Sequence, residues 1–419
     1  MTNIIEEVRN TARKQLYKRI IWTLVIITIY ILGRNISLIE VVPKEIENSS
    51  FSLLKIASSA TGGNINNLTL FSLGLGPWMS AMIIWRVITM NKNWKLDKLP
   101  KKTADKIQMN LTLVIGFIQA LGIVSVYDLN DSYLKIGDYK WPTMFMLCLI
   151  LTAGAFFLVW LSFRNTDLGL GNSVVIIMVG MMISWPAEIL NFFLVGINNL
   201  DNATLIVIWF LVGLLFILMI TTIITETAEY RVPVNRIMLI NKRQKSYIPI
   251  KLNPAGGMPI MYAFTLMALF QYISLALKYF FPTNNGVIWF GKNIGLDSFL
   301  GVCIYIFILY SLTIGFAFIN VTPDKLAENM QKSGDYIDNV RPGKDTEIYL
   351  SKIVSRLAKI GAAYIIIFTG LPMFLGVYVE NIRDFLTIPG SAFIIVGMTV
   401  MTIDQVNELL IRTKYTDIL

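Results

Sequence analysis

Residues 61–88 read TGGNINNLTLFSLGLGPWMSAMIIWRVI. Two adjacent glycines stand near the start of this stretch, and glycine permits sharp backbone turns that other residues resist. From Leu68 onward the side chains are mostly apolar, and the run is long enough to cross a bilayer core, which takes about 20 helical residues. Gly74, Gly76 and Pro77 interrupt the run near its start. The stretch therefore predicts a membrane helix that is weakened at one end.

The whole chain has the composition of a membrane protein. Of its 419 residues, 55% are hydrophobic and 15% are charged, with a mean hydropathy of +0.62, whereas roughly a quarter of a soluble domain is charged. Apolar runs of membrane-spanning length recur along the sequence. We therefore predict an all-α polytopic membrane protein with ten transmembrane helices, over residues 20–39, 68–90, 107–127, 143–163, 172–196, 203–226, 255–279, 298–320, 357–379 and 388–410.

The basic residues predict the orientation of these helices. Most of the 36 Lys and Arg residues fall in every second loop, beginning with the N-terminal segment. Because loops rich in Lys and Arg stay in the cytoplasm, both termini are predicted to be cytoplasmic. The net charge of +9 is then explained by loops that face anionic lipid. No nucleic-acid partner is expected.

The residue types present exclude several kinds of chemistry. The sequence contains no histidine and only two cysteines, Cys148 and Cys303. Ser-His-Asp hydrolysis, His-ligated zinc or haem and thiolate metal clusters are therefore excluded, and we expect no catalytic, cofactor-binding or metal-binding residue and no enzyme. Glu188, Glu226 and Asp404 fall toward the ends of predicted helices. Because a carrier driven by ions normally keeps an ionisable group at mid-membrane, a transporter is disfavoured.

A second weakened helix begins five spans later, where residues 253–259 read NPAGGMP. Because five is an odd number, helices in corresponding positions run in opposite directions, as they do in an inverted repeat. We therefore predict two inverted five-helix halves, residues 1–200 and 201–419. The alternative is that Gly and Pro are simply frequent in membrane helices.

Residues 51–60, FSLLKIASSA, lie between the first two predicted spans and are amphipathic at helical spacing. They are too few to cross a bilayer, so they predict a re-entrant or interfacial helix. Non-helical backbone at membrane depth is tolerated only where protein or a water-filled cavity satisfies its polar groups. The glycines and asparagines that follow this segment therefore indicate a cavity open to the outside.

These motifs resemble those of the SecY family, the pore subunit of the protein-conducting channel. Residues 61–88 are similar to the family's segment from plug to second helix, residues 251–263 to the start of its seventh helix, and residues 331–343, QKSGDYIDNVRPG, to its eighth-to-ninth loop. The resemblance implies an hourglass channel with an apolar waist, plugged from outside by a short helix at about 51–61. It assigns helices 1–5 and the plug to the first half. Helices 6–10 and the cytoplasmic loops 227–252 and 321–356 fall in the second.

The resemblance also implies functional residues, by position. Such families usually fill the waist with isoleucine, whereas three positions here are methionine, whose flexible side chain would make a more compliant seal. Ordinary core packing is the alternative for these methionines, and ordinary interhelical hydrogen bonding is the alternative for the polar gate residues. The implied pore ring is Leu75, Met79, Val174, Met178, Met261 and Ile394; the lateral gate is Ser80, Gln119 and Asn253; and the motor-docking residues are Lys242, Arg243, Lys245 and Arg341.

The partners implied by the resemblance are a SecA-type ATPase motor, SecE- and SecG-like small membrane subunits, a secretory preprotein and lipid of the bacterial cytoplasmic membrane. Because the chain has no G-x-x-x-x-G-K-[ST] phosphate loop, a partner must hydrolyse ATP. Arg86 and Pro233 depart from the housekeeping pattern. With the methionine-rich ring, they make the chain similar to the accessory branch of Gram-positive bacteria, which exports serine-rich glycoprotein adhesins. The alternatives are a housekeeping SecY channel, a secondary transporter with inverted repeats and a structural scaffold.

Overall fold

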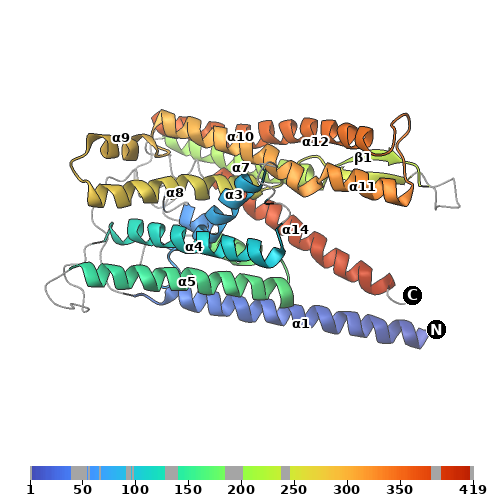
Figure 1. Ribbon diagram of the computed structural model, residues 1–419, viewed down its shortest axis with the longest axis horizontal. Helices are drawn as coiled ribbons and strands as arrows, with labels where there is room; N and C mark the ends of the chain where they lie inside the picture. The colour runs from blue at the N-terminus through green and yellow to red at the C-terminus, as the bar shows by residue number, and fades with distance from the viewer. Residues whose placement is uncertain are drawn as a thin grey trace. The chain divides into compact units, whose positions relative to one another are not determined.

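The computed structural model describes residues 2–38, 54, 57–65, 68–90, 96, 99–127, 140–184, 202–236, 246–378 and 388–415. These residues form mainly helices, together with a two-stranded sheet (Figure 1). The named elements are α1 (Thr2–Asn35), α3 (Gly76–Met90), α4 (Lys101–Val124), α5 (Lys140–Leu168), α7 (Asn202–Thr227), β1 (Glu229–Val234), β2 (Ser246–Lys251), α8 (Met258–Phe280), α9 (Asn285–Asn293), α10 (Phe299–Val321), α11 (Pro323–Ser333), α12 (Lys344–Ile365), the π-helical turn η3 (Ile366–Gly370), α13 (Leu371–Tyr378) and α14 (Ile388–Tyr415).

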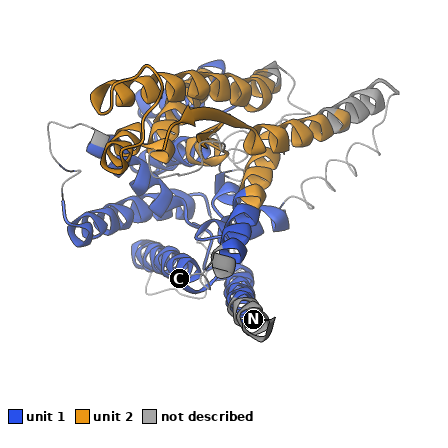
Figure 2. Ribbon diagram, turned by 90° about the vertical axis from the view of Figure 1, so that its right-hand side faces the viewer, with its two compact units in different colours: residues 1–198, 264–302, 401–419 blue, residues 199–263, 303–400 orange. Residues whose placement is uncertain are grey.

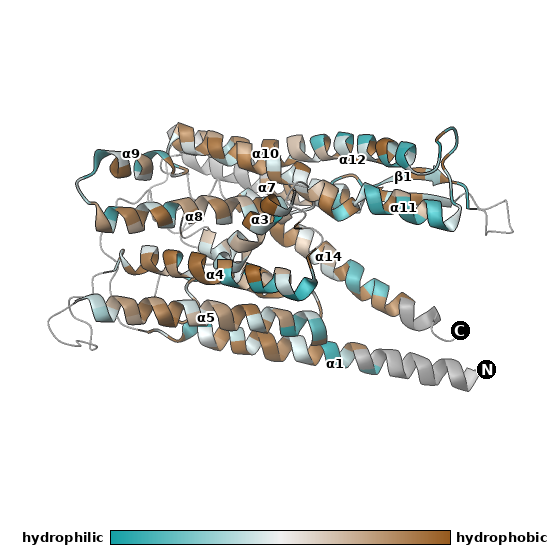
Figure 3. Cartoon of the chain, viewed as in Figure 1, coloured by the Kyte–Doolittle hydropathy of each residue, from teal (hydrophilic) through white to brown (hydrophobic). Residues whose placement is uncertain are grey.

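Seven helical stretches within the described residues are long and apolar enough to cross a membrane. They correspond to the predicted spans that begin at residues 20, 107, 143, 255, 298, 357 and 388. The other three predicted spans overlap α3, the helix over Val174–Ser184, and α7, which are shorter or described only in part. Figure 3 shows apolar residues along α5, α8 and α10 and hydrophilic residues along α11. The chain is a multi-pass membrane protein, and the count of ten spans stays a prediction.

The chain divides into two compact units (Figure 2). Unit 1 comprises residues 1–198, 264–302 and 401–419, and unit 2 comprises residues 199–263 and 303–400. The division falls within α8, α10 and α14, so these helices each contribute residues to both units. These units are defined by compactness, whereas the predicted halves, residues 1–200 and 201–419, are defined by an internal repeat. The two inverted halves therefore stay a prediction.

In unit 1, α1 packs on α5, α5 on α4, and α4 on α3 (Figure 1). Glycines permit close approach to the segment before α3. A Cβ atom on Gly154 of α5 would lie 2.1 Å from the Leu70 carbonyl oxygen, and one on Gly33 of α1 would lie 2.0 Å from the Phe71 ring. Small residues let backbones meet at helix crossings in membranes. Residues 68–75 are therefore held between α1 and α5.

The second membrane helix begins later than the sequence predicts. Residues 68–75 were expected to be helical, but they form turns, and α3 begins after them. The reason is Gly74, whose φ of +57° does not fit a right-handed helix. α8 begins in the same way, because Gly256 has a φ of +65° and also lies two residues before its helix. Pro77 and Pro259 are each the second residue of their helix, so the two helix starts share one geometry.

Unit 2 contains a β-hairpin that the sequence did not predict, within a chain whose described residues are mainly helical, as expected. β1 and β2 pair antiparallel, with Val234 opposite Ser246. Val232, Val234 and Ile250 are buried, while residues on either side of them are exposed, as expected for strands with one buried face. The strands are only 6 residues each and lie in a predicted loop, where a search for membrane-length apolar runs does not detect them.

The predicted plug segment is described in part. Leu54 and residues 57–60 are helical, and residues 61–65 form the turn that follows them. All of these residues are buried or half-buried. The remaining residues of the predicted plug lie outside the described part of the chain, so the complete plug helix stays a prediction.

Candidate functional site

Four of the predicted pore-ring residues lie in unit 1, on two helices. Leu75 directly precedes α3, and Met79 lies one turn further, where its N–H donates to the Leu75 carbonyl oxygen at 3.0 Å. Both side chains are fully buried. Val174 and Met178 are also one turn apart, on the helix over Val174–Ser184, and are half-buried. Because residues four apart share a helix face, each pair presents two apolar side chains on one side of its helix.

The turn before Val174 is fixed by side chains from three helices of unit 1. The Asn165 amide of α5 donates to the Leu170 carbonyl oxygen at 2.9 Å. The Thr23 hydroxyl of α1 accepts from the Leu170 N–H at 2.8 Å, and the Gln405 side chain of α14 accepts from the next N–H at 2.8 Å. Because backbone polar groups away from water need partners, these three side chains determine where the helix begins.

The other two pore-ring residues lie in unit 2. Met261 is in the first turn of α8, Ile394 is near the start of α14, and both are buried. The two helix starts pass close to each other, since a Cβ atom on Gly257 would lie 3.4 Å from the Ile394 Cα atom. Met261 and Ile394 therefore lie on neighbouring helices of unit 2. The complete ring draws on both units and stays a prediction.

Two predicted gate residues are in contact in unit 1. Gln119 Nε2 of α4 donates to Ser80 Oγ of α3 at 3.4 Å, and both residues are buried. The next residue along α3, Ala81, packs in an apolar cluster with Ile115 of α4 and Leu269 of α8. By the family resemblance, the lateral gate is expected as a seam between the second and third spans on one side and the seventh and eighth on the other. Along these residues α3 and α4 pack directly against α8.

α4 and α8 also meet at Gly122, within unit 1. A Cβ atom on Gly122 would lie 2.8 Å from the Tyr272 carbonyl oxygen and 3.0 Å from its Cα atom. A Cβ atom on Gly116, earlier on α4, would make only ordinary contacts, the nearest at 3.4 Å. Gly122 is thus a position where any added side chain would force the seam apart.

The third predicted gate residue, Asn253, has a partner that the sequence did not indicate. Its Nδ2 donates to Glu226 Oε1 at 3.0 Å, and it is 2% exposed while Glu226 is 4% exposed. A Cβ atom on Gly361 of α12 would lie 2.7 Å from Asn253 Oδ1, which has no hydrogen-bond partner among the described residues. The carboxylate in the last turn of α7 therefore fixes the gate amide within unit 2.

The predicted motor-docking residues are described only in part. Lys242, Arg243 and Lys245 lie outside the described residues. Arg341 is exposed, and its carbonyl oxygen accepts from Thr346 Oγ1 at 2.9 Å, which fixes the turn into α12. The guanidinium is thereby presented on a defined turn.

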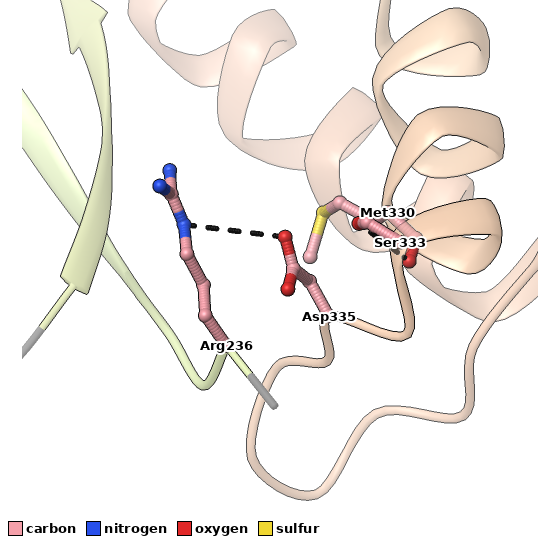
Figure 4. A network of polar contacts seen from close by, with 4 residues as sticks. All are labelled: Arg236, Met330, Ser333 and Asp335. Atoms are coloured by element: carbon pink, nitrogen blue, oxygen red, sulfur yellow. Dashed lines mark hydrogen bonds and ion pairs between the residues drawn. The ribbon is translucent and has the colours of Figure 1, made fainter. Parts of the chain in front are cut away.

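The two predicted cytoplasmic loops are joined to each other in unit 2. Asn235, just after β1, exchanges two backbone hydrogen bonds with Tyr336, at 2.8 and 3.0 Å, and its side chain donates to Asp338 Oδ1 at 2.5 Å. Arg236 Nε lies 4.0 Å from Asp335 Oδ2 (Figure 4). An ion pair this open contributes little, so the backbone pairing is what aligns the loops. Residues from both loops therefore form one surface.

Two buried polar residues of unit 1 were not assigned a role from the sequence. Arg34, in the last turn of α1, is 6% exposed, and Gln271 of α8 is buried with its Oε1 unpartnered among the described residues. The signal for both was a polar residue inside an apolar run of membrane length. No group of three or more Cys, Asp or Glu in the described ranges is placed to hold a metal ion.

The chain is similar to known proteins in both sequence and fold. The SecY family pattern matches residues 69–403. The chain is 38% identical to the accessory Sec system protein translocase subunit SecY2 of Leuconostoc gelidum subsp. gasicomitatum, over 95% of this chain and 96% of that protein. It is 36% identical to the SecY2 subunit of Streptococcus sanguinis, over 96% of this chain and 98% of that protein. The solved structure of a protein conducting channel matches with a TM-score of 0.67 at 17% identity, over 95% of this chain and 93% of that one.

Gly122→Ala is predicted to push α4 away from α8. Because the nearest atoms are backbone atoms, the helices must shift, and overpacking of this kind costs about 1–3 kcal/mol. Gly116→Ala is the matched control on the same helix, since its methyl group meets no close contact. We expect a lower melting temperature in detergent for Gly122→Ala alone. Equal melting temperatures for the two variants would contradict the close approach.

Proposed function

Because the chain belongs to the SecY family, we propose that it is the channel subunit of an accessory protein translocase, conducting unfolded polypeptides across the bacterial cytoplasmic membrane. The observation that carries this is the similarity to accessory translocase subunits over 95% of the chain. That similarity includes both weakened helices and both predicted cytoplasmic loops. The housekeeping channel, the functional alternative within the family, is disfavoured because the chain is similar to accessory subunits over 95% or more of its length.

In this proposal the pore ring is the barrier to ions. A narrow apolar constriction excludes water, so an ion that enters it loses its hydration shell, while a polypeptide can push the side chains aside. Each unit supplies buried apolar residues to the proposed ring, Leu75 and Met79 from unit 1 and Met261 and Ile394 from unit 2. The ring requires the two inverted halves, 1–200 and 201–419, to face each other. The shared geometry of the α3 and α8 starts supports that arrangement.

The packed seam is proposed as the lateral gate. Neutral polar contacts between helices in lipid contribute about 0.6–2 kcal/mol each, which is small enough for a signal helix to replace. The Gln119–Ser80 contact is of this kind, but it joins α3 and α4 on one side of the gate. Closure across the gate comes from the packing of Ala81 and Ile115 against Leu269 of α8. Asn253, held by Glu226, would be the polar group on the other side of the gate.

The surface formed by the two joined loops is proposed as the docking site of a SecA-type motor. Arg341 lies on it, and Lys242, Arg243 and Lys245 would extend it at the tip of the hairpin. An external motor is needed because the chain has no phosphate loop of its own. SecE- and SecG-like subunits would complete the channel, with both termini in the cytoplasm. The cargo would be serine-rich glycoprotein adhesins, as expected for the accessory branch.

The proposed function is tested by reconstituting the full chain with its small subunits in proteoliposomes. Motor- and ATP-dependent protection of a preprotein from protease is expected. Arg341→Glu should lower that protection at least about tenfold, since reversal of a docking charge typically costs 1.4 kcal/mol or more. Lys292→Glu is the control, because Lys292 is also exposed but lies on α9, in a predicted outer loop.

Uptake of a small solute without motor or ATP would instead identify a carrier. Wild-type protection by Arg341→Glu would leave the channel intact and refute the docking assignment.

The ring assignment is tested by changing Met79, Met178 and Met261 together to Ser. Polar side chains at the constriction should admit water and raise resting ion conductance in planar bilayers at least about tenfold, because a loss of about 1.4 kcal/mol from the barrier suffices. The control changes Met146 to Ser, because this methionine is exposed and lies on α5, which carries no proposed ring residue. Unchanged conductance in the ring variant would refute the placement of the ring.

A further inference from the structure

Arg34 is a cation buried inside a membrane helix without a carboxylate among the partners described for it. It lies in the candidate span Leu16–Asn35 and is 6% exposed. Its guanidinium donates to the Gly180 carbonyl oxygen at 2.8 Å, to Ser184 Oγ at 2.8 Å and to the Tyr30 hydroxyl at 3.3 Å. An ionisable group in a membrane span is costly, and such groups are retained for a purpose. The pore ring, gate and docking surface use none of these contacts.

The contacts of Arg34 continue through Tyr30 to the backbone that follows the short helix at 57–60. The fully buried Tyr30 hydroxyl donates to the Gly62 carbonyl oxygen. A phenol has one proton to donate, so its oxygen remains available to accept from Arg34. Arg34 therefore donates to Tyr30, and Tyr30 in turn donates to the Gly62 carbonyl oxygen.

The helix over Val174–Ser184 closes the other side of this turn. A Cβ atom on Gly180 would lie 2.5 Å from the Gly62 Cα atom, and Gly62 itself has a φ of +78°. Arg34 binds the carbonyl group of the same Gly180. One guanidinium thus joins α1 to the helix that carries two pore-ring residues, and the turn at Gly62 lies between them.

The same turn is joined to the start of α3. The Leu75 N–H donates to the Thr61 carbonyl oxygen at 2.9 Å, and a Cβ atom on Gly74 would lie 2.6 Å from that oxygen. Leu75 is the first residue of the proposed ring. Contacts that fix the turn at residues 61 and 62 therefore also fix the position of the short helix relative to the backbone of Leu75.

We propose that Arg34 and Tyr30 form a latch that keeps the plug seated, and that releasing the Tyr30 hydroxyl from Gly62 is a step in channel opening. This rests on the proposed function. When the plug leaves, Tyr30 loses its acceptor at Gly62, while Arg34 keeps its partners Tyr30, Gly180 and Ser184. The closed state is favoured because only there does the Tyr30 hydroxyl have the Gly62 carbonyl oxygen as its acceptor. Arg34 and Tyr30 act as positioning residues, without touching the translocating polypeptide.

The test uses Tyr30→Phe, which removes only the hydroxyl and keeps the ring stacked on Phe71, at a centroid distance of 6.4 Å. Tyr17→Phe, on the same helix but 63% exposed, is the matched control. The full chain with its small subunits is placed in planar bilayers without preprotein. Loss of one buried hydrogen bond should raise the open fraction, and hence resting conductance, by roughly tenfold. The same variant should export a preprotein with a defective signal sequence.

A second series separates a latch from a merely structural residue. Arg34→Gln should raise resting conductance as Tyr30→Phe does, while Arg34→Lys, which retains a charged donor, should restore part of the closure. Ser184→Ala removes a single acceptor and gives a milder variant if the Arg34 changes reduce folding. A structural role alone would lower the melting temperature without raising conductance or relaxing signal-sequence dependence.

The latch is overturned if Tyr30→Phe and the folded Arg34 or Ser184 variants conduct no more than Tyr17→Phe, while the wild type still gives motor-dependent protection. Failure of wild-type protection would overturn the proposed function, and the latch with it. The two failures are therefore distinguishable by the wild-type reconstitution.

Discussion

The arrangement of unit 1 depends on one constraint, which is that the non-helical backbone of residues 61–65 and 68–75 must satisfy its polar groups without relying on water. Such backbone is tolerated at membrane depth only where protein surrounds it or a cavity hydrates it. Two buried tyrosines supply partners, since Tyr30 of α1 donates to the Gly62 carbonyl oxygen and Tyr127, three residues after α4, donates to the Ile65 carbonyl oxygen. With the segment fixed in this way, the start of α3 follows, and so does the position of the residues proposed for the pore.

The sequence predicted the membrane helices well because their signal is local. An apolar run of about 20 residues has few alternatives to a helix in lipid, whatever its neighbours are. The start of α3 was wrong by eight residues because hydropathy does not distinguish an apolar turn from an apolar helix. The helix starts late because Gly74 has a positive φ, and a hydropathy profile does not report backbone angles. The β-hairpin was missed for the opposite reason, since its alternation is short and lies outside any membrane-length run.

The candidate site was predictable as a set of residues but only partly as a set of contacts. The motifs identified Ser80 and Gln119, and the structure brings them together. They also identified Asn253, but its partner Glu226 is 27 residues away on another helix, and no spacing in the sequence links the two. Long-range pairing of this kind depends on how helices cross, which is a property of the fold rather than of a motif.

Magnitudes explain how a channel sealed in this way can still open. A neutral interhelical hydrogen bond in lipid contributes about 0.6–2 kcal/mol, and one from a charged donor about 1.5–3 kcal/mol. Moving a two-state equilibrium from almost entirely closed to almost entirely open takes about 5.5 kcal/mol of differential binding. In the proposed latch the bond from Tyr30 to Gly62 supplies part of that free energy, and packing of Ala81 and Ile115 against Leu269 would supply more. Each of these contributions is small enough to be reversed by a ligand that favours the open state. In the proposed translocase, the opposing free energy would come from what binds the chain, the preprotein on one hand and the proposed motor on the other.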